Sequence, residues 1–292
     1  MKIYLNGQFV EKERAVVSVF DHGFLYGDGV FEGIRAYNGR VFRLDDHLKR
    51  LQKSAEAILL ALPMPLKKIE AAVLDTLRTN KLRDGYVRLI LTRGPGDLGL
   101  DMRKCKAGAT LIVIADRIEL YPEVYYDKGL ELIVSTIRQR RPDQLAPTIK
   151  SLNYLPNVMA RAEATRAGAQ EAVLLSTDGY VTECSGDNIF FIRDGGIVTS
   201  PMHIGILEGV TRKVVMELCR DKLGTPAVER LFAPSELQAA DEVFLTGSAA
   251  EIVPAVKLDG RTIGSGSAGP VTKRLIGLFR EYAATPGSGT PI

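Results

Sequence analysis

Along most of the chain, short apolar runs typical of strands alternate with amphipathic runs typical of helices. The first block has strand signals at 2–10 and 15–20, followed by "YGDGVFEGIRAYNGRVF" at 26–42, whose glycines indicate a strand, a turn and a strand. Because the apolar period switches repeatedly between a strand and a helix pattern, helices must pack against a sheet. The sequence therefore predicts a mixed α/β (α+β) fold.

The first block also contains a clear helix pattern at 43–62. Its apolar residues fall on one face, and Asp45 and Asp46 suit the positive end of a helix dipole in the first turn. That face consists of Leu44, Leu48, Leu51, Ala55, Ile58 and Leu59. The next predicted elements are an amphipathic helix at 66–80 and covered strands at 86–94 and 109–116.

A polar, Tyr- and Pro-rich stretch interrupts this pattern and is the predicted interdomain linker, at 118–129. It would separate a small N-terminal α/β domain, 1–117, from a larger C-terminal domain, 130–292. The tail at 284–292 lacks core residues and is expected to be loose. In the second block the pattern predicts strands at 130–137, 171–176, 188–193 and 242–246, with helices near 152–167, 209–223 and 234–239.

The charge balance argues against a nucleic-acid binder, because 38 Lys and Arg are nearly balanced by 35 Asp and Glu. The short cluster "RQRR" at 138–141 is interpreted as a solvated loop, with attraction of an anionic ligand as the less favoured alternative. Three widely spaced cysteines without CxxC spacing indicate neither a disulfide framework nor a zinc site, and no metal is expected. The N-terminus lacks the apolar core of a signal peptide, and no stretch is long enough to span a bilayer, so we expect a cytoplasmic protein.

Lys150 occupies an unusual position in "PTIKSLNYLPNVMARAEA", just before a helix pattern in which Leu155, Val158 and Met159 recur at helical spacing. Tyr154 lies four residues after it, at the entrance of the helix. A lysine in such a place is usually solvated. Only other parts of the chain can argue for a special role.

Two of the segments that bear on this lysine contain an acid and a helix start. In "VTECSGDNIFFI", Glu183 stands among small residues at the end of a strand, where backbone amides alone could satisfy it. In "GILEGVTRKVVMELC", Gly209 and Thr211 lie at a helix N-terminus, whose N–H groups suit either a phosphate or an ordinary cap.

Two more segments are equally ambiguous alone. The strand pattern of "FLTGSAAEIVPA" runs into Gly247, Ser248 and Ala249, and such small residues let backbone amides approach an anion or simply form a tight turn. Arg50 closes "RLDDHLKR" on the first helix, where it would either clamp a phosphate or be solvated.

Taken in order, these motifs resemble the branched-chain aminotransferases, within the pyridoxal-phosphate enzymes of fold type IV. The motifs are "YGDGVFEGIRAY", "IKSLNYLPNV", "TECSGDNIF", "GVTR" and "GSAAEIVP", and the resemblance covers nearly the whole chain. It implies two domains, of which the larger C-terminal one is a pseudo-barrel of α/β type.

The resemblance implies that Lys150 holds pyridoxal 5′-phosphate covalently and then moves a proton between the substrate Cα and the cofactor. That role needs an amine that can be neutral, which partial burial and nearby positive charge favour. Glu183 would keep the pyridine nitrogen protonated, and Tyr154 would bond the ring hydroxyl. The implied cofactor-binding residues are Arg50, Lys150, Tyr154, Glu183, Leu207, Gly209, Val210, Thr211, Gly247 and Ser248.

The same resemblance implies an apolar pocket for L-leucine, L-isoleucine or L-valine, whose amino group would pass to 2-oxoglutarate in two stages. Arg88 would meet the distal carboxylate of 2-oxoglutarate, together with Tyr26 and, from a neighbouring subunit, Tyr121. The alternative for Arg88 is a strand arginine paired with an acid inside the small domain. The implied substrate-binding residues are Tyr26, Phe31, Gly33, Arg35, Tyr86, Arg88, Ser248 and Ala249. Because an apolar pocket discriminates methylenes weakly, preference among the three substrates does not follow.

Three alternatives remain. D-amino acid aminotransferases carry an Arg-x-His trap where this chain has Leu98 and Leu100, and they tend to carry leucine where it has Tyr154. Aminodeoxychorismate lyase shares the fold. A non-catalytic pyridoxal-phosphate carrier would be expected to lack Lys150 or Glu183, and both are present. The relatives are at least homodimers or higher homo-oligomers, in which "GDLGLD" at 96–101 would close the partner's pocket.

Overall fold

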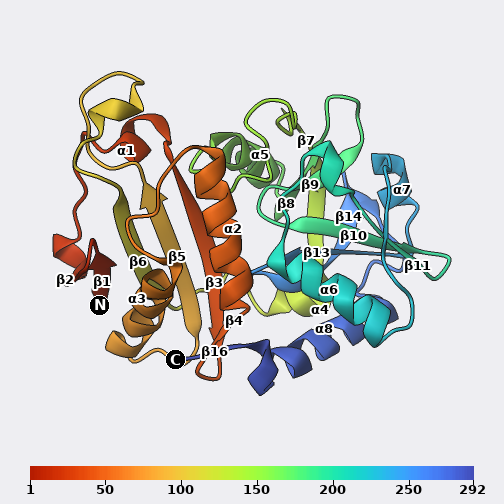
Figure 1. The fold of residues 1–292 in the computed structure, drawn as a ribbon. Coiled ribbons are helices and arrows are strands. Elements are labelled where there is room, and N and C mark those ends of the chain that lie inside the picture. The colour runs from red at the N-terminus through yellow and green to blue at the C-terminus, as the bar shows by residue number, and fades with distance from the viewer. The chain divides into compact units, whose positions relative to one another are not determined.

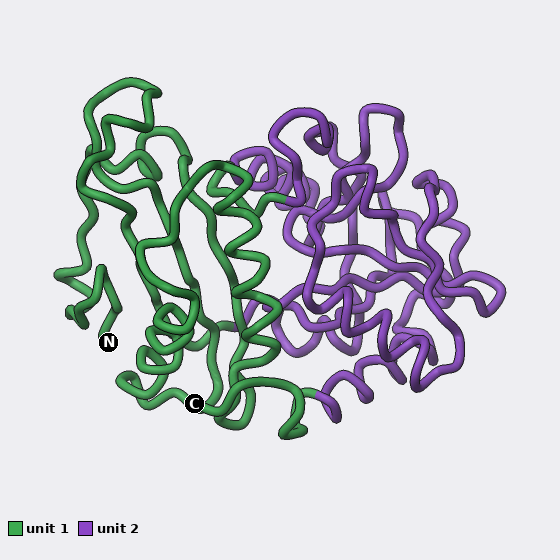
Figure 2. Tube along the Cα trace, in the orientation of Figure 1, with its two compact units in different colours: residues 1–118, 149–153, 283–292 green, residues 119–148, 154–282 purple.

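The computed structural model describes residues 1–292, which fold into two units (Figure 2). Unit 1 comprises residues 1–118, 149–153 and 283–292, and unit 2 comprises residues 119–148 and 154–282. Three segments therefore depart from the predicted organisation. Residues 149–153 and 283–292 belong to unit 1, and most of the predicted linker, residues 119–129, is part of unit 2. The chain crosses between the units on both sides of Lys150.

Unit 1 is built on a seven-stranded sheet, with strand order β16-β4-β3-β5-β6-β1-β2 and every neighbouring pair antiparallel (Figure 1). Its strands are β1 (Lys2–Leu5), β2 (Gln8–Glu11), β3 (Gly29–Tyr37), β4 (Arg40–Phe42), β5 (Gly85–Thr92), β6 (Thr110–Asp116) and β16 (Gly289–Pro291). Its helices are α1 (His22–Tyr26), α2 (Leu44–Ala57) and α3 (Leu66–Thr79), with short 3-10 turns at Lys12–Arg14, Met102–Lys104 and Pro286–Ser288.

Helices α2 and α3 cover one face of this sheet and enclose its core (Figure 1). The predicted helix face is confirmed for Leu44, Leu48, Leu51 and Ala55, which are buried. Leu59 is an exception, with 72% of its surface exposed, because α2 ends at Ala57 and the chain turns outward.

Two sequence predictions for unit 1 are wrong. Residues 15–20 form no strand; local turns such as the bond from Asp21 N to Ser18 O replace sheet pairing. The tail at 284–292 is not loose, because β16 pairs with β4 and Ser288 is buried. The Pro and Gly residues of the tail suggested a loop, but an edge strand such as β16 tolerates them.

Unit 2 contains a mixed sheet with the order β12-β11-β10-β13-β14-β7-β8-β9, and β15 pairs with β14. Its strands are β7 (Leu130–Arg138), β8 (Glu171–Leu175), β9 (Val181–Cys184), β10 (Asn188–Arg193), β11 (Gly196–Thr199), β12 (Val228–Glu229), β13 (Glu242–Gly247), β14 (Glu251–Leu258) and β15 (Arg261–Thr262). Its helices are α4 (Val124–Lys128), α5 (Leu155–Arg166), α6 (Val210–Asp221), α7 (Pro234–Gln238) and α8 (Pro270–Ala283), whose last residue lies in unit 1, with a 3-10 turn at Met202–Ile204. The strands and helices predicted for the second block are confirmed within a few residues.

Helix α5 packs through small residues rather than through its large apolar ones. Ala160 and Ala164 are fully buried against β7 and β8, whereas Leu155, Val158 and Met159 are 68%, 58% and 48% exposed. Alanines allow the helix backbone to approach the sheet closely, and the stripe of larger apolar residues, Leu155, Val158 and Met159, points outward. None of the helices in the chain combines the length and hydropathy that crossing a bilayer would require.

Candidate active site

Lys150 lies in an extended segment of unit 1 that runs beside the start of β3. Phe31 N donates to Lys150 O at 3.0 Å, and Leu152 N donates to Gly29 O at 2.9 Å. On the other side, Lys150 N donates to Ser54 Oγ of α2 at 3.1 Å. The backbone of this lysine is therefore held between a strand and a helix, and the residue is half-buried.

The lysine side chain shares an aromatic ring with an arginine. Lys150 Nζ lies 4.7 Å from the centroid of the Phe31 ring, and Arg88 Cζ also lies 4.7 Å from it. Arg88 Cζ is 5.5 Å from the Tyr86 ring, so two aromatic rings flank the guanidinium. It forms no ion pair with a carboxylate of this chain, so its charge is balanced by ring contacts alone.

Gly33 provides the space that this arrangement needs. It faces Arg88 across the β3–β5 ladder, and a Cβ atom at Gly33 would collide with the Tyr86 hydroxyl. Arg35, two residues further along β3, stacks on Tyr37 and lines a cavity of about 400 Å³. The cavity is also lined by Lys81, Leu82, Arg83, Asp84, Gly85, Arg117 and Ile118.

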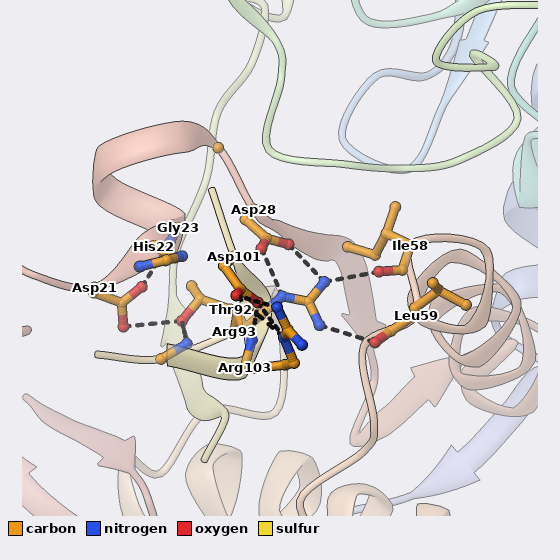
Figure 3. Close-up of polar contacts among 12 residues, drawn as sticks. Asp21, His22, Gly23, Asp28, Ile58, Leu59, Thr92, Arg93, Asp101 and Arg103 are labelled. Carbon is orange, nitrogen blue, oxygen red and sulfur yellow. Dashed lines mark hydrogen bonds and ion pairs between the residues drawn. The ribbon is translucent and has the colours of Figure 1, made fainter. Parts of the chain in front are cut away.

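Tyr26 ends α1, which Asp21 anchors. The Asp21 carboxylate accepts hydrogen bonds from Gly23 N at 2.8 Å and from the Thr92 hydroxyl at 2.9 Å (Figure 3). The Tyr26 hydroxyl accepts a bond from Gly99 N at 2.9 Å, so the 96–101 loop contacts Tyr26 of its own chain.

Arg93 joins the start of β3 to the end of α2 (Figure 3). Its guanidinium forms a bidentate pair with Asp28, at 2.6 and 2.9 Å. It also donates to Ile58 O at 2.7 Å and Leu59 O at 2.8 Å, which are carbonyls left over at a helix C-terminus. No sequence pattern marks this residue, because Arg93 lies far along the chain from the helix end that it contacts.

Arg50 is buried in unit 1 with only 8% of its surface exposed, and it is not solvated. Glu32 and His47 form a hydrogen-bonded cluster with it, and neither was predicted to belong to the site. Glu32 lies inside the Gly-rich motif at 26–42, and His47 is on the same helix one turn before Arg50.

In unit 2, Glu183 lies in β9 with 7% of its surface exposed. One carboxylate oxygen accepts a bond from Gln139 Nε2 at 2.6 Å. The other accepts bonds from Asn188 Nδ2 at 3.1 Å and Leu207 N at 3.0 Å. These three donors stabilise an ionised carboxylate, which is costly to bury without partners.

The "RQRR" cluster is not simply a solvated loop, because its two central residues are partly or fully inside unit 2. Gln139 is buried against Glu183, and Arg140 is half-buried with its Nε and Nη1 atoms inaccessible and without hydrogen-bond partners. Burial lowers the pKa of Arg140, while the charges of Tyr154 and Glu183 oppose that shift. Arg140 therefore accompanies two of the predicted site residues. Its charge gave no signal that it would be inside.

Helix α6 has an N-terminus suited to an anion. Gly209 is its N-cap, no side chain caps it, and Val210 and Thr211 are buried at 5% and 3% exposure. A Cβ at Gly209 would collide with the Asn188 side chain. Buried N–H groups without a side-chain cap need another acceptor, and a phosphate would provide one.

Residues 248–250 form the turn between β13, which ends at Gly247, and β14. A Cβ at Gly247 would collide with Asp187, because the Asp187 side chain lies directly against the backbone at this glycine. The Thr246 hydroxyl, just before the turn, is buried without a hydrogen-bond partner. Ser248 and Ala249 are half-buried in the turn itself. The end of β13 and the turn after it thus combine small residues with an unsatisfied polar atom.

The expectation that Tyr121 contacts the substrate of a neighbouring subunit is wrong. Only 4% of its surface is exposed, and its hydroxyl donates to Glu171 at 3.2 Å inside the core of unit 2. Burial raises its pKa, and so do the charges of Asp187 and Glu171. A side chain held in this way cannot serve the substrate of another subunit.

The structure thus groups the predicted residues by unit. Unit 1 contains Tyr26, Phe31, Gly33, Arg35, Arg50, Tyr86, Arg88 and Lys150, and unit 2 contains Tyr154, Glu183, Leu207, Gly209, Val210, Thr211, Gly247, Ser248 and Ala249. No group of three or more His, Cys, Asp or Glu side chains could hold a metal ion.

Comparisons with known proteins identify the family. Residues 29–258 match the family described as amino-transferase class IV. The chain is 47% identical, over 96% of each chain, to a protein of Methanocaldococcus jannaschii provisionally named a branched-chain-amino-acid aminotransferase. It is 38% identical to the D-alanine aminotransferase of Bacillus licheniformis, over 94% of each chain.

The fold agrees with solved structures. The branched-chain amino acid aminotransferase of Thermoproteus uzoniensis with norvaline superposes with a TM-score of 0.90 at 37% identity, covering 97% of this chain and 94% of the other. The resemblance found in the sequence motifs is confirmed, and the chain belongs to the class IV aminotransferases.

Proposed function

We propose that this protein is a pyridoxal-phosphate-dependent transaminase that passes the amino group of L-leucine, L-isoleucine or L-valine to 2-oxoglutarate in two half-reactions. Family membership supports transamination, and the names of relatives and solved structures support the branched-chain substrates. Localisation in the cytoplasm accords with three unpaired cysteines.

One observation carries the choice of substrates: Lys150 and Arg88 lie against the same Phe31 ring, and Arg88 has no carboxylate partner. An apolar wall beside a reactive amine suits a branched aliphatic side chain. A cation without an ion pair suits the second carboxylate of 2-oxoglutarate, which would be costly to bury alone. Both substrates of a two-stage transaminase can thus use one sheet face.

The donor set fits pyridoxal phosphate. The buried N-terminus of α6, which no side chain caps, and the buried Arg50 suit its phosphate. The Glu183 carboxylate, which accepts three hydrogen bonds, suits a protonated ring nitrogen. The residues proposed to bind it are Arg50, Lys150, Tyr154, Glu183, Leu207, Gly209, Val210, Thr211, Gly247 and Ser248. When bound, the cofactor supplies an electron-withdrawing ring that weakens the Cα–H bond of an attached amino acid.

The chain's own residues would then do the following. Lys150 Nζ would take the proton from the substrate Cα and return it to C4′ of the cofactor, so that the amino group stays with the cofactor and the substrate leaves as the oxo acid. Glu183 remains ionised and holds positive charge at the ring nitrogen. Tyr86 and the backbone amides of Ser248 and Ala249 bind the α-carboxylate, while Phe31 keeps water from the side chain.

The proposal is tested with a panel of amino donors on the purified protein, with chiral chromatography of every product. We expect L-leucine, L-isoleucine and L-valine to yield L-glutamate from 2-oxoglutarate, with little conversion of D-alanine. Preferential turnover of D-alanine would instead assign the D-specific activity, and formation of pyruvate from aminodeoxychorismate would assign the lyase activity.

The D-specific alternative is favoured only by the similarity to a D-alanine aminotransferase. Leu98 and Leu100, which stand where such enzymes carry their carboxylate trap, are 63% and 84% exposed and bear no charge. They cannot bind a carboxylate. The lack of the carboxylate trap at these two positions supports the L-branched-chain activity.

Replacing Arg88 by Leu should separate the two half-reactions. We expect the reaction with L-glutamate to slow by about tenfold or more, because a buried carboxylate would lose its cation. The reaction with L-leucine should change by less than about threefold, because the apolar wall remains. Single-turnover absorbance of the cofactor measures each half-reaction, and an equal loss in both would show that Arg88 is only a scaffold.

We also propose that the protein is a homodimer or a higher homo-oligomer. The outward stripe of Leu155, Val158 and Met159 on α5 is apolar surface that a single copy leaves in water. Sedimentation of the purified protein as a monomer at micromolar concentration would contradict this.

A further inference from the structure

A carboxylate lies at the centre of a fully buried polar cluster in unit 1. Glu32, on β3, is 0% exposed, and His47 and Arg50, on α2, are 1% and 8% exposed. Arg50 Nε donates to Glu32 Oε1 at 2.8 Å, and Arg50 Nη2 donates to Oε2 at 2.7 Å. His47 Nδ1 lies 2.7 Å from the same Oε2 atom.

The protonation states in this cluster follow from its geometry. Burial alone would raise the pKa of Glu32, but the charge and hydrogen bonds of Arg50, together with those of His47, lower it to about 2. Burial lowers the pKa of His47. Near neutral pH the carboxylate is therefore ionised and can only accept, so Nδ1 of a neutral His47 carries the proton.

This arrangement fixes the orientation of Arg50. A guanidinium paired through Nε and Nη2 to one carboxylate is held in a single plane, so the direction of its Nη1 edge is also set. His47 in turn holds the carboxylate, because it occupies the oxygen that receives Nη2. Neither arginine nor carboxylate can rotate without breaking a buried hydrogen bond.

The cluster is also adjacent to the lysine segment. Phe31, the residue before Glu32, donates its N–H to Lys150 O, and Ser54, one turn after Arg50, accepts from Lys150 N. The same strand and helix therefore hold both Arg50 and Lys150. The positive charge of Lys150 also contributes to the lowering of the pKa of His47.

We propose that Glu32 and His47 are positioning residues that hold the Arg50 guanidinium ready for the phosphate group of the cofactor. This inference rests on the proposed role of Arg50 as a phosphate ligand. Glu32 and His47 act through Arg50 and do not touch the reacting atoms. They therefore set the affinity for phosphorylated cofactor, and hardly affect the rate once the cofactor is bound.

The test compares two ligands of the apoprotein that differ only in the phosphate: pyridoxal 5′-phosphate and pyridoxal. Glu32→Gln should weaken binding of the phosphorylated ligand by about tenfold or more and change pyridoxal binding by less than about twofold. Activity at saturating cofactor should stay within about threefold. Equal weakening of both ligands would overturn the inference, since it would indicate general damage to unit 1.

His47 provides a milder variant in case Glu32→Gln does not fold. His47→Leu removes the donor and should reduce the affinity ratio of the two ligands by about threefold. His47→Asn places an amide near the Nδ1 position and should restore most of that ratio. A ratio that His47→Leu leaves unchanged would remove His47 from the proposal.

A double-mutant cycle separates this inference from the role of Arg50 itself. If Arg50→Leu abolishes the preference for the phosphorylated ligand and Glu32→Gln then adds no further loss, both hold. If Arg50→Leu leaves the preference intact, Arg50 is not a phosphate ligand. If the two losses simply add, Glu32 does not act through Arg50, and the inference is wrong.

Glu242→Gln is the matched control. Glu242 is another buried carboxylate, but it accepts bonds from Val271 N at 3.0 Å and Thr272 N at 2.7 Å at the start of α8. It touches none of the residues proposed for the cofactor. Its loss should lower thermal stability and leave the ratio of the two affinities unchanged, and a changed ratio would show that the assay reports stability instead.

Discussion

Lys150→Ala is expected to lose transamination by at least about a thousandfold, because no other amine in its segment can move the proton at the substrate Cα. The fold should survive. The backbone bonds of residue 150, to Phe31 and Ser54, do not involve its side chain. Steady-state rates with L-leucine and circular dichroism of the variant measure both expectations.

Lys53→Ala is the control for this substitution, because Lys53 is an exposed lysine next to Ser54 on α2. Its activity should equal that of the unaltered protein. Borohydride reduction followed by peptide mapping gives an independent readout, since it should place a pyridoxyl group on Lys150. A pyridoxyl group on another lysine would refute the assignment.

Glu183→Gln should keep the cofactor bound but slow proton transfer by about a hundredfold or more, because a neutral amide no longer stabilises positive charge on the ring nitrogen. The amide can still accept from Asn188 and Leu207. It would, however, place its NH₂ group opposite the Gln139 donor, so some rearrangement of Gln139 is expected. Single-turnover rates with L-leucine measure the effect.

Cofactor content is checked first by absorbance, so that weak binding is not mistaken for slow chemistry. The Glu242→Gln protein again serves as the control for loss of a buried carboxylate in unit 2. Single-turnover rates of Glu183→Gln that match those of the unaltered protein would remove Glu183 from the ring-nitrogen role.

Much of the fold was accessible from local periodicity. Apolar spacing predicted α2 and α3, because one face of each helix must be buried, and continuous apolar runs predicted β5 and β6. Residues 15–20 and the tail show the limit of such patterns. A strand exists only where a partner strand accepts its hydrogen bonds, and spacing along the chain does not reveal that partner.

For the site, the sequence identified residue types and their order. Motifs around Lys150, Glu183 and Thr211 predicted the family because each carries a group with distinctive chemistry. By contrast, the environment of Arg140 could not be read from a run of charges. Whether an arginine is solvated or inside depends on what packs over it.

The sequence by itself determined which groups are present: an amine before a helix, an acid at a strand end, and glycines where side chains would collide. The tertiary structure alone decided their partners. Glu32 meets Arg50, and Arg88 lies between the rings of Phe31 and Tyr86, because a helix packs on a sheet and two strands pair in one register. Packing and register join residues that are distant along the chain, and local periodicity contains no information about such pairs.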